Sequence, residues 1–234
     1  MRKTLLLLAL LALLGLGATA FADQTKTDAA DRLQSAGKVL HEINATPDKG
    51  IPQEVMEGAK CVAVVPRMIK AAFIFGGKHG RGVSTCKLPN GKWSAPAFFT
   101  ISGGSWGAQI GAESVDLVLM VMNDDGMRHL LSNKFQIGAE AAAAAGPVGR
   151  HAAAGTDWKL DTQILTYSRA HGAFAGISLD GSWIEQDKDS TVALYNKDLT
   201  NEAVLEGKVP VPASAHSFLA AVKTSKAIAN NKPS

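Results

Sequence analysis

The sequence has few aromatic residues and very few cysteines. Phe, Trp and Tyr together make up 6% of the 234 residues, and there are two Cys. Two cysteines exclude a disulfide-dense miniprotein, while 46% hydrophobic residues exclude a disordered or collagen-like chain. The formal net charge of +3 excludes a uniformly basic nucleic-acid-binding protein. The length suits one domain of ordinary size.

Motifs for metals and cofactors are missing as well. The six His form no H-x-x-x-H pair, the two Cys are not arranged as C-x-x-C, and no acidic loop resembles a calcium-binding hand. Basic and aromatic residues do not alternate as they do in RNA-binding surfaces. The sequence therefore predicts no metal, no cofactor and no nucleic-acid partner.

One short motif leaves a catalytic alternative open. Gly103-Gly104-Ser105-Trp106-Gly107 fits G-x-S-x-G, the strained turn that carries the nucleophile of serine hydrolases. That turn requires a strand before it and a helix after it, whereas the residues after Ser105 are predicted to form a strand. We favour a glycine-rich β-turn and a non-enzymatic protein, with a serine hydrolase using Ser105 as the alternative.

The N-terminal segment has the features of a secretory signal peptide. Arg2 and Lys3 precede a Leu/Ala run over residues 5–16, and Ala20-Phe21-Ala22 offers small residues at a cleavage site. A transmembrane anchor is the alternative, but the run is short for a bilayer span. We expect residues 1–22 to be removed and the remaining chain to be periplasmic or associated with the cell envelope.

Export also bears on the two cysteines. An oxidising compartment permits a disulfide between Cys61 and Cys86, the only intramolecular pairing that two cysteines allow. A pair of buried free thiols is the alternative.

Acidic residues are absent from a long internal stretch. Residues 60–112 contain no Asp or Glu, whereas residues 23–59 hold 4 basic and 7 acidic residues and residues 113–206 hold 7 basic and 14 acidic residues. The stretch carries seven cations: Lys60, Arg67, Lys70, Lys78, Arg81, Lys87 and Lys92. On one shared surface they would attract phosphates and anionic headgroups, at about 1 kcal/mol per Lys or Arg near a membrane. Alternatively, they are scattered and neutralised by the acidic residues.

Hydrophobic spacing predicts helices at both ends of the exported chain. From Gln24 to Ile43, apolar residues recur every three or four positions, with Lys26, Arg32 and Lys38 between them. This amphipathic helix would either dock its apolar stripe on the domain core or lie on a membrane surface. A second helix is predicted over residues 213–230.

Short apolar runs bounded by turn residues predict strands between these helices. The predicted strands cover residues 61–65, 71–75, 82–86, 93–102, 115–121, 163–168, 173–179 and 182–184. We expect the glycines of residues 76–82 to form a tight hairpin with Lys78, His79 and Arg81 exposed at its tip. For the Ala/Gly-rich residues 138–155 the sequence is compatible with helix, strand or loop. Successive strands favour an α+β fold, namely a single domain dominated by antiparallel β-strands with N-terminal and C-terminal helices packed on it.

Several motifs, in order, resemble the SYLF lipid-binding domain. They are Ile51-Pro52, Ala59 to Pro66, Gly80-Arg81-Gly82-Val83, Trp93 to Phe98, Gly103 to Gly111, Gly146 to Arg150, Tyr167-Ser168-Arg169, Gly172 to Gly181, Tyr195-Asn196 and the region of Pro210. The similarity covers most of the exported chain, so we expect one SYLF-like domain over residues 23–230 and a tail of residues 231–234.

The resemblance implies a non-enzymatic module that binds anionic membrane lipids, phosphoinositides in its eukaryotic members, some of which also bind actin. It suggests that the N-terminal helix and the basic surface meet the membrane. Matching positions point to Lys26, Arg32, Lys38, Arg67, Lys70, Lys78 and Arg81. We expect an exported member to make peripheral contact with an anionic lipid rather than with actin. A structural envelope protein that binds another protein is a further alternative.

Overall fold

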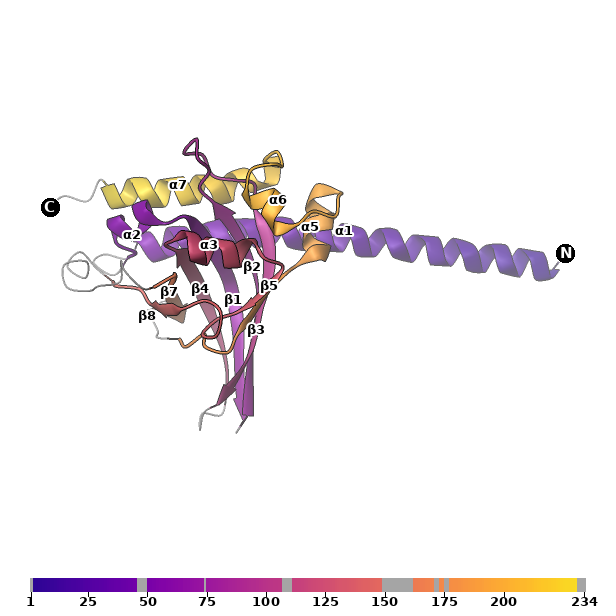
Figure 1. Cartoon of the computed structure of the whole chain (residues 1–234). Helices are drawn as coiled ribbons and strands as arrows, with labels where there is room; N and C mark the ends of the chain where they lie inside the picture. Colours follow the sequence, from indigo (N-terminus) through magenta and orange to yellow (C-terminus); the bar gives the residue numbers. More distant parts are fainter. Residues whose placement is uncertain are drawn as a thin grey trace.

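The β-strands join into one curved sheet that carries helices on both faces (Figure 1). The computed structural model describes residues 2–45, 50–73, 75–106, 111–148, 162–170, 173–174 and 177–230. Within them the sheet has nine strands in the order β5-β9-β3-β2-β1-β4-β7-β6, with β8 paired to β7. Every pairing is antiparallel except that of β6 with β7.

The strands at the centre of the sheet are much longer than those at its edges. The central strands are β1 (Cys61–Phe73), β2 (Phe75–Cys86), β3 (Ala97–Trp106) and β4 (Gly111–Val121). The others are β5 (Lys134–Gln136), β6 (Ala143–Ala145), β7 (Ile164–Ala170), β8 (Ala173–Phe174) and β9 (Trp183–Gln186). The central strands therefore extend past their helix-covered part, as Figure 1 shows.

The helices divide between the two faces of the sheet. One face packs against α1 (Arg2–Ala45), α2 (Gln53–Gly58) and α7 (His216–Asn230), which follows the 3₁₀ turn Ala213–Ala215. The other packs against α3 (Asp124–Leu131) and α6 (Asn201–Leu205), and α5 (Lys188–Tyr195) lies beside α1. No helix in the described part of the chain is long and apolar enough to cross a bilayer. The α+β fold with terminal helices on a mostly antiparallel sheet is confirmed.

Strand alternation gives the sheet two hydrophobic cores. Val62 and Val64 of β1 belong to the cluster that includes α1 and α7, while Ala63 and Val65 belong to the cluster on the opposite face. Successive side chains of a strand point to opposite faces, so a run of consecutive apolar residues marks a strand buried on both sides. The five-residue apolar run of β1 thus reflects its central place in the sheet.

The apolar stripe of α1 is docked on the core. Leu33, Leu40 and Ile43 are fully buried, together with Phe218 of α7. Helix α7 lies close to α1, and a Cβ atom at Gly37 would stand 3.5 Å from the Cα atom of Phe218. Of the two arrangements open to this helix, the structure shows docking, and the stripe is covered by protein.

The glycine-rich segment is strand and not a hairpin turn. Residues 76–82 lie inside β2, whose first residue, Phe75, pairs with the last residue of β1, Phe73. Gly103 and Gly104 lie inside β3 rather than in a turn. The reason is close packing: a Cβ atom at Gly80 would stand 2.4 Å from Val65, and one at Gly82 would stand 2.3 Å from the ring of Phe99. Glycine is needed here because neighbouring side chains occupy the space of its missing Cβ. The predicted exposed cationic tip is therefore wrong.

Other boundaries differ in smaller ways. Strand β3 begins at Ala97 rather than at Trp93, β1 continues past Pro66, and helices α5 and α6 were not predicted. Gly91 and Gly181 have positive φ, +77° and +74°. Strand β6 falls in the Ala/Gly-rich tract, of which residues 149–155 lie outside the described residues.

Candidate functional site: an arginine-lined pocket

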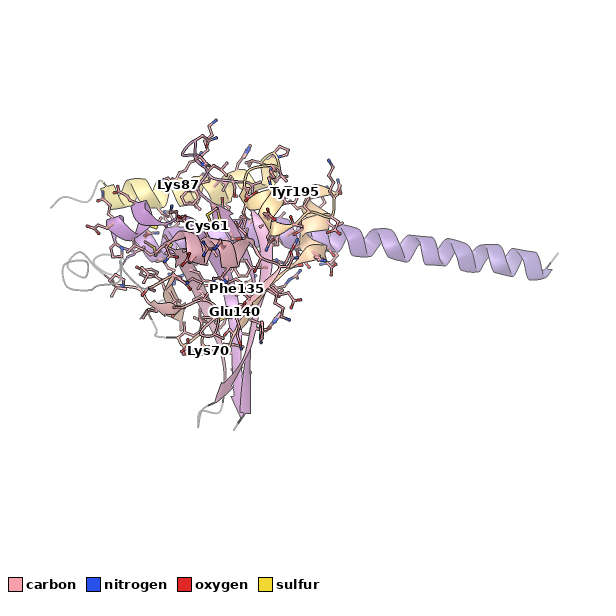
Figure 2. The ribbon with its side chains drawn as sticks, in the orientation of Figure 1. Cys61, Lys70, Lys87, Phe135, Glu140 and Tyr195 are labelled. Carbon is pink, nitrogen blue, oxygen red and sulfur yellow. A yellow bond between two sulfur atoms is a disulfide. The ribbon has the colours of Figure 1, made fainter. Side chains whose placement is uncertain are left out.

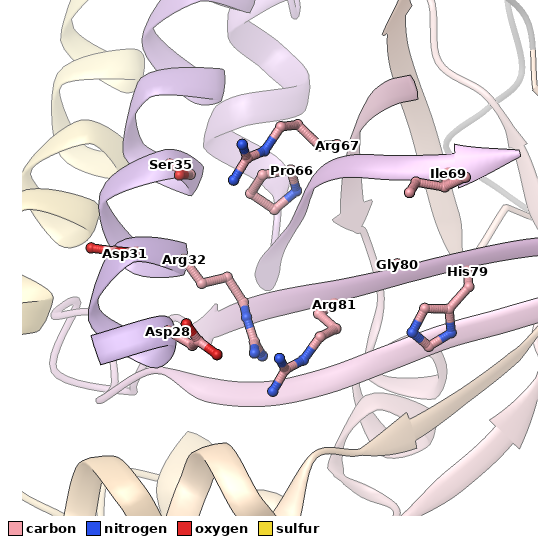
Figure 3. A pocket seen from close by; sticks show the side chains of 10 residues that line it. All are labelled: Asp28, Asp31, Arg32, Ser35, Pro66, Arg67, Ile69, His79, Gly80 and Arg81. Atoms are coloured by element: carbon pink, nitrogen blue, oxygen red, sulfur yellow. The ribbon is translucent and has the colours of Figure 1, made fainter. Parts of the chain in front are cut away.

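A pocket of about 340 Å³ lies between helix α1 and strands β1 and β2 (Figure 3). Its lining residues are Asp28, Asp31, Arg32, Ser35, Pro66, Arg67, Ile69, His79, Gly80 and Arg81. The volume lies at the lower end of the range of about 300–1,000 Å³ for small-molecule sites. Three of the seven predicted lipid-binding residues, Arg32, Arg67 and Arg81, meet here although they are far apart in the sequence.

Arg32 forms the buried floor of the pocket. Its guanidinium donates to Asp187 at 2.9 Å and to the hydroxyl of Ser190 at 3.1 Å, and it lies 5.1 Å from the ring centre of Phe98. Burial lowers the pKa of Arg32, although the hydrogen bond to Asp187 opposes that shift. With only 7% of its surface exposed, Arg32 is a structural tie between α1 and the start of α5.

Arg81 shares the same carboxylate. Its Nη2 atom lies 3.2 Å from Asp187 and 3.0 Å from the Ser190 hydroxyl, but 41% of its side chain is exposed. Burial alone would raise the pKa of Asp187, yet the hydrogen bonds from Ser190 and Arg32 outweigh burial and lower it. Because one carboxylate faces two guanidinium groups, the cluster of Arg32, Arg81 and Asp187 retains an excess positive charge.

Arg67 enters the pocket from a β-bulge. The register of β1 shifts between Val65 and Met68 against β4, so that two residues of β1, Pro66 and Arg67, oppose one residue of β4, Asp116. Arg67 has a φ of +50°, a left-handed conformation that is uncommon outside glycine. Figure 3 shows its guanidinium directed toward α1. Arg67 lines the pocket, and within the described residues its side chain makes no hydrogen bond or ion pair.

The remaining lining groups shape the charge of the pocket. Asp28 acts electrostatically on Arg32, whereas Figure 3 shows the carboxylate of Asp31 directed away from the arginines. Ile69, 57% exposed, and His79 are register partners beside the pocket. Four lining residues were not predicted, namely Asp28, Asp31, Ser35 and Ile69. No motif marks them, because they join the site only when the fold brings them beside the cations.

The other four predicted cations lie elsewhere. Lys78 occupies the opposite face of β2 and is 6% exposed; its ammonium donates to the Ser178 carbonyl at 2.8 Å, and burial lowers its pKa. Lys70, its register partner, lies 3.8 Å from Glu113 and toward the far end of β1 (Figure 2).

Lys38 lies 3.8 Å from Glu42 on the exposed side of α1. Lys26 is exposed on α1 outside the lining. The seven predicted lipid-binding residues therefore do not share one surface.

A disulfide joins the two cysteines. Cys61 and Cys86 are register partners on β1 and β2, and both are fully buried on the face opposite α1. Of the two alternatives for these cysteines, the structure shows the bridge.

The geometry around Ser105 does not form a hydrolase elbow. Ser105 lies in β3 and pairs with Gly76 of β2, and the next described element is strand β4. A nucleophile elbow needs a sharp turn into a helix at that point. No group of three or more His, Cys, Asp or Glu in the described chain could hold a metal ion.

Known proteins provide an independent comparison. The model of the Ysc84 family, described as "Las17-binding protein actin regulator", matches residues 102–225. SH3 domain-containing YSC84-like protein 1 is 35% identical in Rattus norvegicus and 33% in Homo sapiens, each over 79% of this chain and 56% of the relative. Protein YSC84 of Saccharomyces cerevisiae is 31% identical over 74% of this chain and 37% of its own.

The chain thus spans little more than half of the mammalian relatives and little more than a third of the yeast protein. The family model matches from the end of β3 through most of α7. The chain therefore belongs to the Ysc84/SYLF family of non-catalytic binding modules.

Proposed function

We propose that this chain is a peripheral membrane-binding module that docks the phosphate of an anionic lipid headgroup in the arginine-lined pocket. The observation that carries the proposal is the guanidinium of Arg67, which faces a pocket next to the positive Arg32–Arg81 cluster without an ion pair among the described residues. A guanidinium presents a planar fork of donors that matches phosphate oxygens.

The proposed binding mode uses the docked helix as a wall. The apolar stripe of α1 is buried, so it contributes to the core and not to insertion into a bilayer. Ile69 instead provides an exposed apolar side chain beside the charged pocket. A lipid headgroup combines these chemistries, because its phosphate borders the hydrocarbon region of the membrane.

Vesicle binding tests the proposal with a matched pair of variants. Arg67→Ala and Lys70→Ala each remove one positive charge from β1, but only Arg67 lines the pocket. On phosphatidylglycerol vesicles we expect Arg67→Ala to weaken binding about tenfold, the value of one lost charge-assisted hydrogen bond, and Lys70→Ala to weaken it less than twofold. Wild-type binding should also weaken with salt. Equal losses in the two variants, or binding that ignores salt, would contradict the pocket as the site.

We also propose export, on the pattern of residues 1–22. An exported module would meet envelope lipids rather than Las17, the binding partner that the family description names. Mass spectrometry of the chain from a periplasmic fraction should find an N-terminus at Asp23. An uncleaved N-terminus in a membrane fraction would favour the anchor instead.

A further inference from the structure

The bulge that delivers Arg67 to the pocket has its own support from Asp116. The backbone N–H of Arg67 donates to Asp116 Oδ1 at 3.0 Å rather than to a carbonyl of a neighbouring strand. Asp116 lies on β4 between Val115 and Leu117, which pair with the residues that flank the bulge, Met68 and Val65. Asp116 is therefore the one β4 residue opposite the two bulge residues of β1, Pro66 and Arg67.

The bulge is costly without such support. β1 is an interior strand, and Pro66 has no N–H to give to the sheet, so the ladder breaks there. A left-handed conformation is unfavourable for a non-glycine residue, because it brings the Cβ atom too close to the following carbonyl oxygen. The hydrogen bond from the Arg67 N–H to a carboxylate is charge-assisted, and such bonds are roughly twice as strong as neutral ones.

Asp116 is in turn held on its other side. Its Oδ2 atom lies 3.5 Å from Nη2 of Arg169, its register partner on β7, and Arg169 also bonds to Glu42 of α1. Asp116 and Arg169 are 21% and 14% exposed. The carboxylate is thus fixed between the bulge and an arginine that is anchored to the helix forming the other wall of the pocket.

We infer that Asp116 is a positioning residue: it holds the left-handed backbone of Arg67 and so keeps the guanidinium aimed into the pocket. This inference rests on the proposed function for its consequence in binding. It predicts that loss of the Asp116 carboxylate weakens binding to an anionic membrane. Net charge alone predicts the opposite, because removing a carboxylate would strengthen that attachment.

The binding test compares two acidic residues of the same strand. Asp116→Ala should weaken binding to phosphatidylglycerol vesicles about fivefold. Glu113→Ala makes the same change in net charge on β4 and should leave affinity unchanged or slightly stronger. Asp116→Asn retains a side-chain oxygen for the Arg67 N–H and should bind within twofold of wild type. In an Arg67→Ala background, Asp116→Ala should weaken binding no further.

Equal behaviour of Asp116→Ala and Glu113→Ala, or additive losses with Arg67→Ala, would overturn the inference. A second measurement does not depend on lipid. Glycine adopts a φ of +50° without a side-chain penalty, so Arg67→Gly should restore most of the melting temperature that Asp116→Ala loses. No restoration would show that Asp116 does not act on this backbone. If wild-type protein fails to bind vesicles, the proposed function fails and the melting data alone decide the role of Asp116.

Discussion

Arg32 and Arg67 face the same pocket from opposite walls and have opposite surroundings. Arg32 is 7% exposed and bonds to Asp187 and Ser190, whereas the guanidinium of Arg67 is exposed and has no ion pair within the described residues. A buried charge must be paired to be tolerated, and pairing satisfies its donors. Arg32 is therefore committed to joining α1 to α5, while Arg67 remains available to a ligand.

The difference shows why a cluster of cations is an incomplete description of a binding surface. Seven basic residues were predicted to bind lipid, but Arg32 and Lys78 are buried, and Lys38 and Lys70 lie near carboxylates. What distinguishes Arg67 is its backbone, which leaves the sheet at a bulge. Four experiments test this contrast, in order of expected effect.

The largest expected effect is on the structural side of the pocket. Asp187→Ala leaves Arg32 buried without its carboxylate, which should lower the free energy of unfolding by about 3–5 kcal/mol. Urea denaturation measures this loss. Asp189→Ala, an exposed carboxylate in the first turn of α5, is the control and should cost less than about 1 kcal/mol. Similar losses in both variants would mean that the buried network does not hold the pocket together.

The disulfide should come next. Cys61 and Cys86 are 25 positions apart, and closing a loop of that size stabilises a chain by about 3.5 kcal/mol in the chain-entropy model. Replacing both by Ala should lower stability by this amount while leaving vesicle binding unchanged, because the bridge lies on the face opposite the pocket. Loss of binding by a folded double variant would contradict the separation of the two faces.

The direct comparison of the two arginines follows. Arg32→Ala should cost about 2 kcal/mol, less than Asp187→Ala because Arg81 still pairs with the carboxylate. Arg67→Ala should change stability by less than about 0.5 kcal/mol, as is usual for exposed residues. Thermal denaturation of the two variants side by side gives the answer. A larger destabilisation by Arg67→Ala would assign Arg67 to the fold and remove it from the site.

The smallest effect concerns pH. The pKa of Asp187 is lowered in the folded chain, so its stabilising contribution is complete above the ordinary pKa of a carboxyl, near 4, and is lost as pH falls through the folded value. Stability should therefore decline below about pH 5, and Asp187→Asn should flatten that decline. Glu42, whose pKa is lowered by its hydrogen bond with Arg169, titrates in the same direction, so some slope should remain. If stability of Asp187→Asn declines with falling pH as steeply as that of the wild type, Asp187 is excluded as a source of the decline.

Local patterns in the sequence predicted much of the fold. The spacing of Leu33, Leu40 and Ile43 marks the buried stripe of α1, and the run from Cys61 to Val65 marks a strand covered on both faces. Asn90-Gly91 and Asp180-Gly181 mark turns because glycine adopts positive φ at little cost. These features depend on the period of one helix or strand, or on a few adjacent residues.

The errors arose where one strand packs on another. Gly80 and Gly82 have the composition of a turn, yet they are strand residues whose missing Cβ atoms leave room for Val65 and the ring of Phe99. Lys78 was expected at an exposed tip and is buried beneath the Ser178 carbonyl. Those partners are distant in sequence or across a strand pair, so no local pattern records them.

The sequence by itself determined the family, the terminal helices, the strand-rich middle and the set of available cations, because each is written in local spacing or in ordered motifs. Only the tertiary structure decided that, of the three arginines lining the pocket, Arg67 has no side-chain partner among the described residues. Pairing of Arg32 with Asp187 spans 155 positions, and that of the Arg67 N–H with Asp116 spans 49. Whether a charge is compensated depends on atoms within a few ångströms of it, and the fold alone brings those atoms together.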